Sequence, residues 1–151
     1  LFRSWFTANR LAQTSLRQLL WYLRGRQRPI WVPGQTLDFS PTSAISGNAV
    51  DVVEAGFTEL GIRPGRRDIS ILLADGTRHY RRITAVSLVS GAERLALDGD
   101  AISAGQNQIV SISLMTLARQ DADSVSWEHV TDADGVARVA TTFTGVRDEL
   151  E

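Results

Sequence analysis

The stretch "DISILLADGTRHYRRITAVSLVSGAERLALDGD" (residues 68–100) decides the fold, because strand-like apolar runs alternate in it with turn signals. The dipeptide Asp75-Gly76 supplies the positive φ angles of a tight hairpin turn, and Ser90-Gly91 marks a second turn. The stretch therefore predicts three consecutive antiparallel strands joined by short turns.

Strand-like runs continue on both sides of this meander. We expect further strands or extended segments at 29–34, 48–53, 108–119, 124–130 and 136–143, with a turn at 131–135. No helical run separates these strands in a βαβ pattern. The sequence therefore predicts a mainly β (α+β) fold: an antiparallel β-barrel or sandwich preceded by one N-terminal amphipathic helix.

The one clear helix covers residues 9–24. Thr7 or Asn9 can cap its start, Gly25 stands where a left-handed C-cap belongs, and Pro29 forbids continuation. The apolar stripe at helical spacing consists of Ala12, Leu16, Leu19, Leu20 and Leu23.

The length of 151 residues fits one domain. We expect residues 1–34 to form a helix and extended linker that pack on a body, and residues 35–151 to form that body as an antiparallel β domain. Because the chain starts with Leu1 and not methionine, we also expect further sequence before it.

Composition narrows the function classes. The net charge is −1, so no global field attracts nucleic acid or anionic lipid, and no apolar run is long enough to span a membrane. The absence of cysteine excludes disulfides and thiolate metal sites. All sixteen basic residues are arginine, which a GC-rich genome explains and which also suits planar, bidentate contacts at interfaces.

Catalytic signals are absent from the pattern. Neither His79 nor His129 has a metal-ligand neighbour at useful spacing, and "DADG" (132–135) lacks the calcium-loop ligands at positions five and twelve. There is no G-x-S-x-G, H-E-x-x-H or P-loop motif. We therefore expect no enzyme, no catalytic residue, no metal and no cofactor.

A second face of the predicted helix carries arginine. Arg10, Arg17 and Arg24 recur every seven residues, and Trp21 falls among them, away from the apolar stripe. Arg17 and Trp21 lie one turn apart and are placed to stack. A tryptophan among arginines is an unusual core residue, so this side of the helix is a candidate contact surface.

The order of the segments resembles that of the minor, or distal, tail proteins at the tail tip of long-tailed bacteriophages and prophages. A helix ending in "LRGRQRPIWVPG" (23–34) precedes "RRDISILLADGTRHYRRITAV" (66–86), "GAERLALDGD" (91–100) and "VSISLMTLARQDADSVSWEH" (110–129). The resemblance covers roughly residues 9–145. The family pattern often has threonine after the proline, where this chain has Gly34.

The resemblance implies a structural virion protein without an active site. Such a subunit would form a ring with copies of itself and contact other tail proteins, in the virion tail and, during assembly, in the bacterial cytoplasm. Tryptophan and arginine dominate the energetics of protein interfaces. On this interpretation the candidate interface residues are Arg10, Arg17, Trp21, Arg24, Arg26, Arg28 and Trp31.

Alternatives remain open at this point. Trp31 can equally fill the space between helix and sheet. A small β-barrel could bind nucleic acid through its arginines, although seventeen acidic residues are interspersed with them. A carbohydrate-binding module could stack a sugar on Trp127, which is otherwise a core or cross-strand residue.

Overall fold

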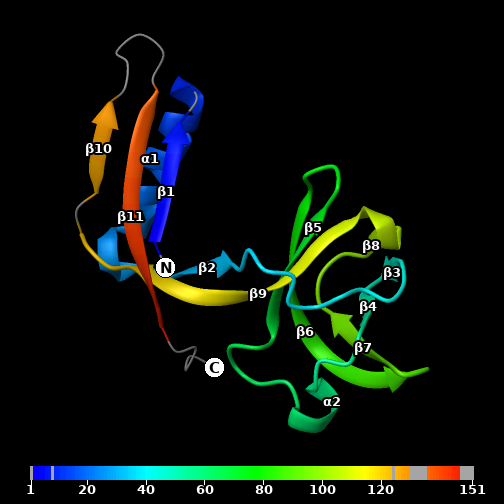
Figure 1. Cartoon of the computed structure of the whole chain (residues 1–151). Helices are drawn as coiled ribbons and strands as arrows, with labels where there is room; N and C mark the ends of the chain where they lie inside the picture. Colours follow the sequence, from blue (N-terminus) through cyan, green and yellow to red (C-terminus); the bar gives the residue numbers. More distant parts are fainter. Residues whose placement is uncertain (1, 8, 124, 130–135, 147–151) are drawn as a thin grey trace. The chain divides into compact units, whose positions relative to one another are not determined.

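The computed structural model describes residues 2–7, 9–123, 125–129 and 136–146, and the chain divides into two compact units (Figure 1). The first unit combines residues 1–31 with 117–146, and the second holds residues 32–116. This division differs from the expected boundary after residue 34, because the N-terminal segment shares its sheet with the C-terminal strands.

The first unit is a small sheet with one helix. Its central strand is β11 (Ala137–Gly145), which pairs antiparallel with β1 (Phe2–Thr7) and with β10 (Ser126–His129). The end of β9 (Ile109–Gln120) pairs with β11 at Phe143 opposite Gln120. The strand β1 has no counterpart among the strands predicted from the sequence. The predicted turn at 131–135 lies outside the described residues.

The predicted helix is present as α1 (Arg10–Leu23), drawn across one face of β1 and β11 in Figure 1. Asn9 caps its start, accepting a hydrogen bond from the Ala12 backbone N–H at 2.9 Å. The buried stripe is narrower than predicted, because Ala12 and Leu19 are exposed. The core of this unit comprises Leu16, Leu23, Ala118, Ala137, Val139 and Phe143.

The helix ends at a left-handed residue. Arg24 has φ 49° and donates its backbone N–H to the Leu20 carbonyl at 3.3 Å. A short 3₁₀ turn, η1 (Gly25–Gln27), follows directly, and β2 (Ile30–Pro33) then pairs with β9. The chain therefore reverses sharply after α1 and carries Arg24, Arg26 and Arg28 around the reversal.

The second unit is built on the predicted meander. In it β9, β5, β6, β7 and β4 are neighbours in that order, all antiparallel, and β3 pairs with β8. The turns after β5 and β6 contain Gly76 and Ser90-Gly91, as predicted. The bounds are β3 (Ile45–Gly47), β4 (Ala49–Val52), α2 (Phe57–Leu60), β5 (Asp68–Leu73), β6 (Arg78–Val89), β7 (Ala92–Leu97), β8 (Ile102–Ala104) and η2 (Gln106–Gln108).

The mainly β class with one N-terminal helix is confirmed, but the barrel alternative is wrong, because the sheet is not closed. The strand β4 shows why. Its outer edge is met by an irregular segment: Thr42 donates to the Asp51 carbonyl at 2.8 Å, and Val53 donates to the Ser40 carbonyl at 2.9 Å. These bonds satisfy an edge that a closing strand would otherwise pair.

The core of the second unit lies along the apolar face of this sheet. Phe39, before β3, and Phe57, the first residue of α2, belong to this core, and their ring centroids lie 5.5 Å apart. The buried residues are Phe39, Ile45, Val50, Val52, Phe57, Ile69, Ile71, Ile83, Leu95, Leu97, Ile102, Ala104 and Ile112. Within the described part of the chain, α1 and α2 are both too short or too polar to cross a membrane.

Candidate protein-interaction surface

Three arginine side chains of the first unit stack on aromatic rings. The guanidinium carbons lie 5.0 Å, 5.8 Å and 4.7 Å from the ring centroids, within the range of cation–π attraction. The three pairs, called the arginine–aromatic surface below, are Arg17 on Trp127, Arg24 on Trp21 and Arg28 on Tyr22.

The predicted stack of Arg17 on Trp21 is replaced by a different pairing. Arg17 lies over Trp127 of β10, and Arg24 lies over Trp21. Helical spacing alone cannot reveal this exchange, because Trp127 reaches α1 only through the pairing of β10 with β11. Arg17 therefore ties the helix to the sheet, while Trp21 and Arg24 form a pair at the end of the helix.

None of the three stacked arginines has a carboxylate partner among the described residues. The local sequence explains why: the first 31 residues contain six arginines and no Asp or Glu. The first unit as a whole holds eight arginines against five acidic residues. Stacking leaves the N–H edges of a guanidinium available for a partner, so these side chains are oriented but not neutralised.

Three large apolar side chains of α1 are exposed in the described part of the chain. Leu11, Trp21 and Tyr22 are 76%, 75% and 53% exposed. They lie opposite the buried stripe of Leu16 and Leu23. Large exposed apolar side chains that are rimmed by charged ones are typical of protein-interaction sites.

The segment that follows α1 is held by hydrogen bonds to the turn after β9, and these bonds are called the latch below. Asp123, in the turn after β9, accepts a hydrogen bond from the Arg26 backbone N–H at 3.0 Å, and Arg26 Nε donates to the Asp121 carbonyl. Gly25 has φ +62°, and a Cβ there would lie 2.9 Å from Asp123 Cα. Only glycine fits both the left-handed backbone and this close approach.

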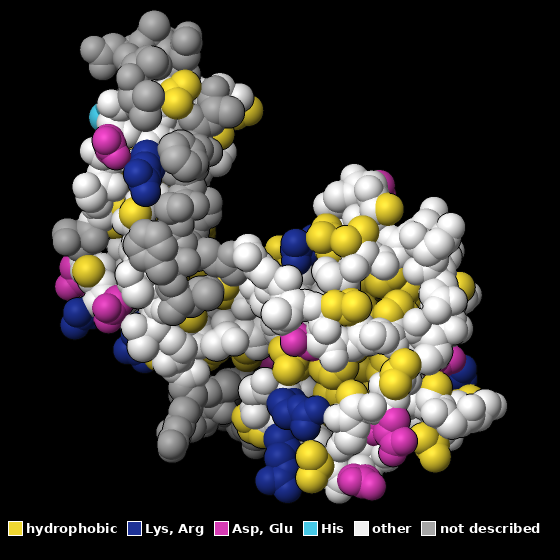
Figure 2. Space-filling model, in the orientation of Figure 1, with side chains coloured by type: hydrophobic (Ala, Val, Ile, Leu, Met, Phe, Trp, Pro, Cys, Tyr) yellow, Lys and Arg dark blue, Asp and Glu magenta, His cyan; other side chains and the backbone are white. Residues whose placement is uncertain are grey.

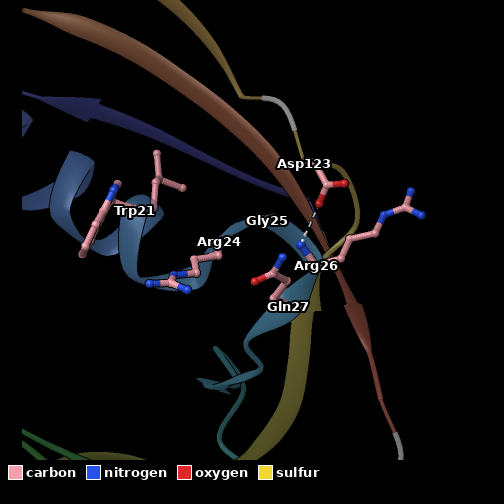
Figure 3. A pocket seen from close by; sticks show the side chains of 7 residues that line it. Trp21, Arg24, Gly25, Arg26, Gln27 and Asp123 are labelled. Atoms are coloured by element: carbon pink, nitrogen blue, oxygen red, sulfur yellow. Dashed lines mark hydrogen bonds between the residues drawn. The ribbon is translucent and has the colours of Figure 1, made fainter.

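An open pocket of about 540 Å³ lies at this reversal. Figure 3 shows Trp21 and Arg24 at the end of the helix, with Asp123 bonded to the backbone of Arg26, whose own side chain points away from Trp21. The lining residues are Leu20, Trp21, Arg24, Gly25, Arg26, Gln27 and Asp123. The pocket thus has an apolar wall beside the Arg24 guanidinium, which pairs with no carboxylate among the described residues, and its lining also includes the carboxylate of Asp123.

The remaining predicted residues have different environments. Arg10 is exposed in the first turn of α1 and has interactions of its own. Trp31 is half-buried in β2, which fits both of its alternatives. Trp127 is half-buried opposite Val139 in the β10–β11 ladder, and Arg17 covers its ring. A sugar would have to compete with Arg17 for that ring face.

The arginines of the second unit are engaged internally. Arg94 forms a bidentate pair with Asp51 at 2.7 Å and 2.8 Å, and this hydrogen bond holds the pKa of Asp51 below its ordinary 3.8. Arg82 Nε bonds Asp68 at 2.9 Å, and Arg78 Nη1 donates to Ser70 at 2.9 Å.

A nucleic-acid track would need a continuous basic strip. On the face that Figure 2 shows, arginine side chains of the second unit gather in one group with acidic side chains nearby, and no strip extends from this group across the described residues of that unit. The internal pairing of the second unit's arginines further reduces the positive charge that phosphates could meet.

Sequence reasoning missed Tyr22 and Asp123. Tyr22 adjoins Trp21. The helical pattern could have predicted its exposure, since position 22 lies away from the buried stripe. Asp123 gave no signal, because its role depends on the long-range approach of the turn after β9 to Gly25.

Among the described residues, no three His, Asp or Glu side chains are grouped closely enough to hold a metal ion. No protein-family profile matches the chain, and no curated protein is significantly similar to it.

Proposed function

We propose that the chain is a structural subunit of the tail of a long-tailed bacteriophage, a tail-tip or distal tail component that assembles with copies of itself and with neighbouring tail proteins. On this proposal it acts by binding proteins and carries out no catalysis. The resemblance in segment order, from the helix to the strand ending in "SVSWEH", supplies the family.

The observation that carries the proposal is the arginine–aromatic surface. Arg17, Arg24 and Arg28 are held on rings without carboxylate partners among the described residues, beside the exposed Trp21. Tryptophan, tyrosine and arginine are the residue types that most often dominate binding energy at interfaces. A surface of this composition favours a protein partner over a small substrate.

Exposure of Trp21 supports a binding role over a core role. A tryptophan side chain that is 75% exposed in the free chain leaves most of its apolar surface in contact with water. Covering it in an assembly would recover roughly 25 cal/mol for each Å² of apolar surface removed from water. This free energy of burying Trp21 is therefore gained only when a partner covers the side chain.

The proposal is tested on particles. Phage tails produced by the genome that contains this gene are purified, their proteins are identified by mass spectrometry, and the subunit is located by gold-labelled antibody in electron micrographs. We expect the chain in stoichiometric amounts at one end of the tail. Complete, infectious tails that lack the chain would contradict the proposal.

A further inference from the structure

We propose that the pocket at the end of α1 binds the acidic segment 148–151 of a neighbouring copy of the chain. The inference rests on the proposed function in one respect, that copies of the chain assemble with one another. It adds which surface of one copy meets which segment of the next.

The pocket is suited to a carboxylate that is followed by an apolar side chain. Arg24 stands at its edge, stacked at 5.8 Å on Trp21, and its guanidinium has no carboxylate partner among the described residues. A guanidinium can bind a carboxylate with two parallel hydrogen bonds. Leu20 and Trp21 supply the apolar wall, and the exposed Gln27 supplies an amide.

The geometry of the pocket is fixed before any ligand arrives. Arg24 occupies a left-handed backbone position, and Asp123 holds the next turn through the Arg26 N–H at 3.0 Å. A site whose residues are already held loses little conformational entropy of its own when it binds a peptide segment. The latch thus holds the backbone next to Arg24 in place before a ligand binds, and Trp21 lies beside it in the last turn of α1.

The sequence of the segment complements this receptor. Residues 148–151 read Asp-Glu-Leu-Glu, and no other run of four residues in the chain contains three acidic side chains. They lie outside the described residues. Arginine clusters commonly recognise acidic segments, and Leu150 would provide an apolar anchor for the wall formed by Leu20 and Trp21.

Three other carboxylates of the described residues are already engaged. Asp51 pairs with Arg94, Asp68 pairs with Arg82, and Glu93 accepts backbone hydrogen bonds. The first 31 residues supply no acidic side chain at all. The charge complementarity therefore points to segment 148–151 as the occupant.

The contact is heterologous, since each copy carries one pocket and one segment. Such contacts join copies head to tail and produce a ring when the rotation between neighbours closes. This is the symmetry that a ring subunit of a tail requires. A self-complementary dimer face would have stopped at two copies.

The test uses two neutralising variants of the full chain. Arg24→Asn removes the pocket cation while retaining a residue that tolerates left-handed backbone. The triple change Asp148→Asn, Glu149→Gln and Glu151→Gln removes the segment's charge. Sedimentation velocity and light scattering measure association of each protein alone and of the two mixed in equal amounts, at low and high salt.

Wild type should self-associate, with weaker association at high salt. Each variant alone should associate at least tenfold more weakly. Their mixture should form a one-to-one dimer and nothing larger, because one intact pocket meets one intact segment. Arg119→Asn, an equal charge change at an exposed residue of β9, should behave as wild type. Trp21→Ala, which leaves the backbone after α1 unchanged, should reproduce the loss seen with Arg24→Asn.

Three results would overturn the inference: a monomeric wild type, variants that associate as wild type does, or a mixture that remains monomeric. Binding of the segment to its own copy's pocket would give the first result. The outcomes are separable from the proposed function. A chain that occurs in tails but does not use this contact refutes only the inference, and a chain that self-associates this way but is absent from tails refutes only the function.

Discussion

The two units treat charged side chains in opposite ways. In the second unit several carboxylates are engaged: Glu93 is fully buried and accepts hydrogen bonds from Ala55 N at 2.8 Å, Thr58 N at 2.7 Å and Thr58 Oγ1 at 2.8 Å. In the first unit Arg24 and Arg28 stack on rings and have no carboxylate partner among the described residues.

This difference teaches which charges maintain the fold and which are available for binding. A buried carboxylate that satisfies several donors fixes one loop conformation, and removing it leaves those donors unpaired. A guanidinium stacked on an exposed ring contributes little to the fold, but it retains its hydrogen-bond donors for a partner. The second unit is thus expected to respond to mutation in stability, and the first in assembly.

The largest effect is expected at Glu93. Glu93→Ala leaves the N–H groups of Ala55 and Thr58 and the Thr58 hydroxyl without their acceptor, which should lower the free energy of unfolding by about 3–4 kcal/mol. Urea denaturation followed by circular dichroism measures the change. Glu59→Ala, on the exposed side of α2, is the matched control and should change stability by less than about 0.5 kcal/mol. Equal effects of the two substitutions would remove Glu93 from this role.

Gly25→Ala should have the next largest effect, on the first unit. The substitution adds both a left-handed backbone penalty and a close approach to Asp123, for an expected loss of about 2–3 kcal/mol. Gly65→Ala is the matched control, since Gly65 has φ +83° and open space around its Cβ direction, and should cost only about 1 kcal/mol. If the two substitutions cost the same, Asp123 does not constrain Gly25.

Acid should weaken the second unit through the same groups. Burial acts to raise the pKa of Glu93, but hydrogen bonds from the Thr58 and Ala55 N–H groups outweigh it and hold the pKa below the ordinary 4.5. Because the folded-state pKa is lowered, the stabilisation is complete above the unfolded pKa and is lost as pH falls through the folded one.

The midpoint of urea unfolding should therefore fall as the pH is lowered from about 5 to about 3, and Glu93→Gln should show a shallower fall. Asp51, whose pKa the Arg94 hydrogen bond lowers, supplies part of the slope that remains. An unchanged slope in Glu93→Gln would show that Glu93 does not titrate differently in the folded chain.

The smallest effect on stability is expected at Trp21. Because Trp21 is mostly exposed, Trp21→Ala should change the unfolding free energy by less than about 0.5 kcal/mol, while it removes a large part of the proposed binding surface. Circular dichroism melts of the free chain measure the first quantity. A loss above about 2 kcal/mol would mean that Trp21 belongs to the core.

Local sequence signals predicted much of the fold. The turn at Asp75-Gly76, the cap at Asn9 and the left-handed backbone of Gly25 follow from backbone chemistry over a few residues, although the C-cap is Arg24 and not Gly25 as predicted. Long-range features were not predictable in the same way. The barrel expectation failed because the segment around Ser40 covers the edge of β4, which no local pattern encodes.

The candidate surface was predicted in composition but not in its contacts. Helical spacing predicted Arg17, Trp21 and Arg24 on one side of the helix; in the structure Arg17 and Trp21 belong to α1, and Arg24 is its left-handed C-cap. The pairing of Arg17 with Trp127 and the latch through Asp123 both depend on strands from the far end of the chain. Sequence spacing therefore indicated the candidate surface, while tertiary structure decided which ring each arginine contacts.

The central claim is that the arginine–aromatic surface is covered by protein in the assembled tail. Hydroxyl-radical footprinting measures this directly, by comparing the oxidation of Trp21 in the free chain with its oxidation in intact tails. The account predicts strong oxidation in the free chain, where Trp21 is 75% exposed, and at least severalfold protection in the tail. Equal oxidation of Trp21 in both states would contradict it.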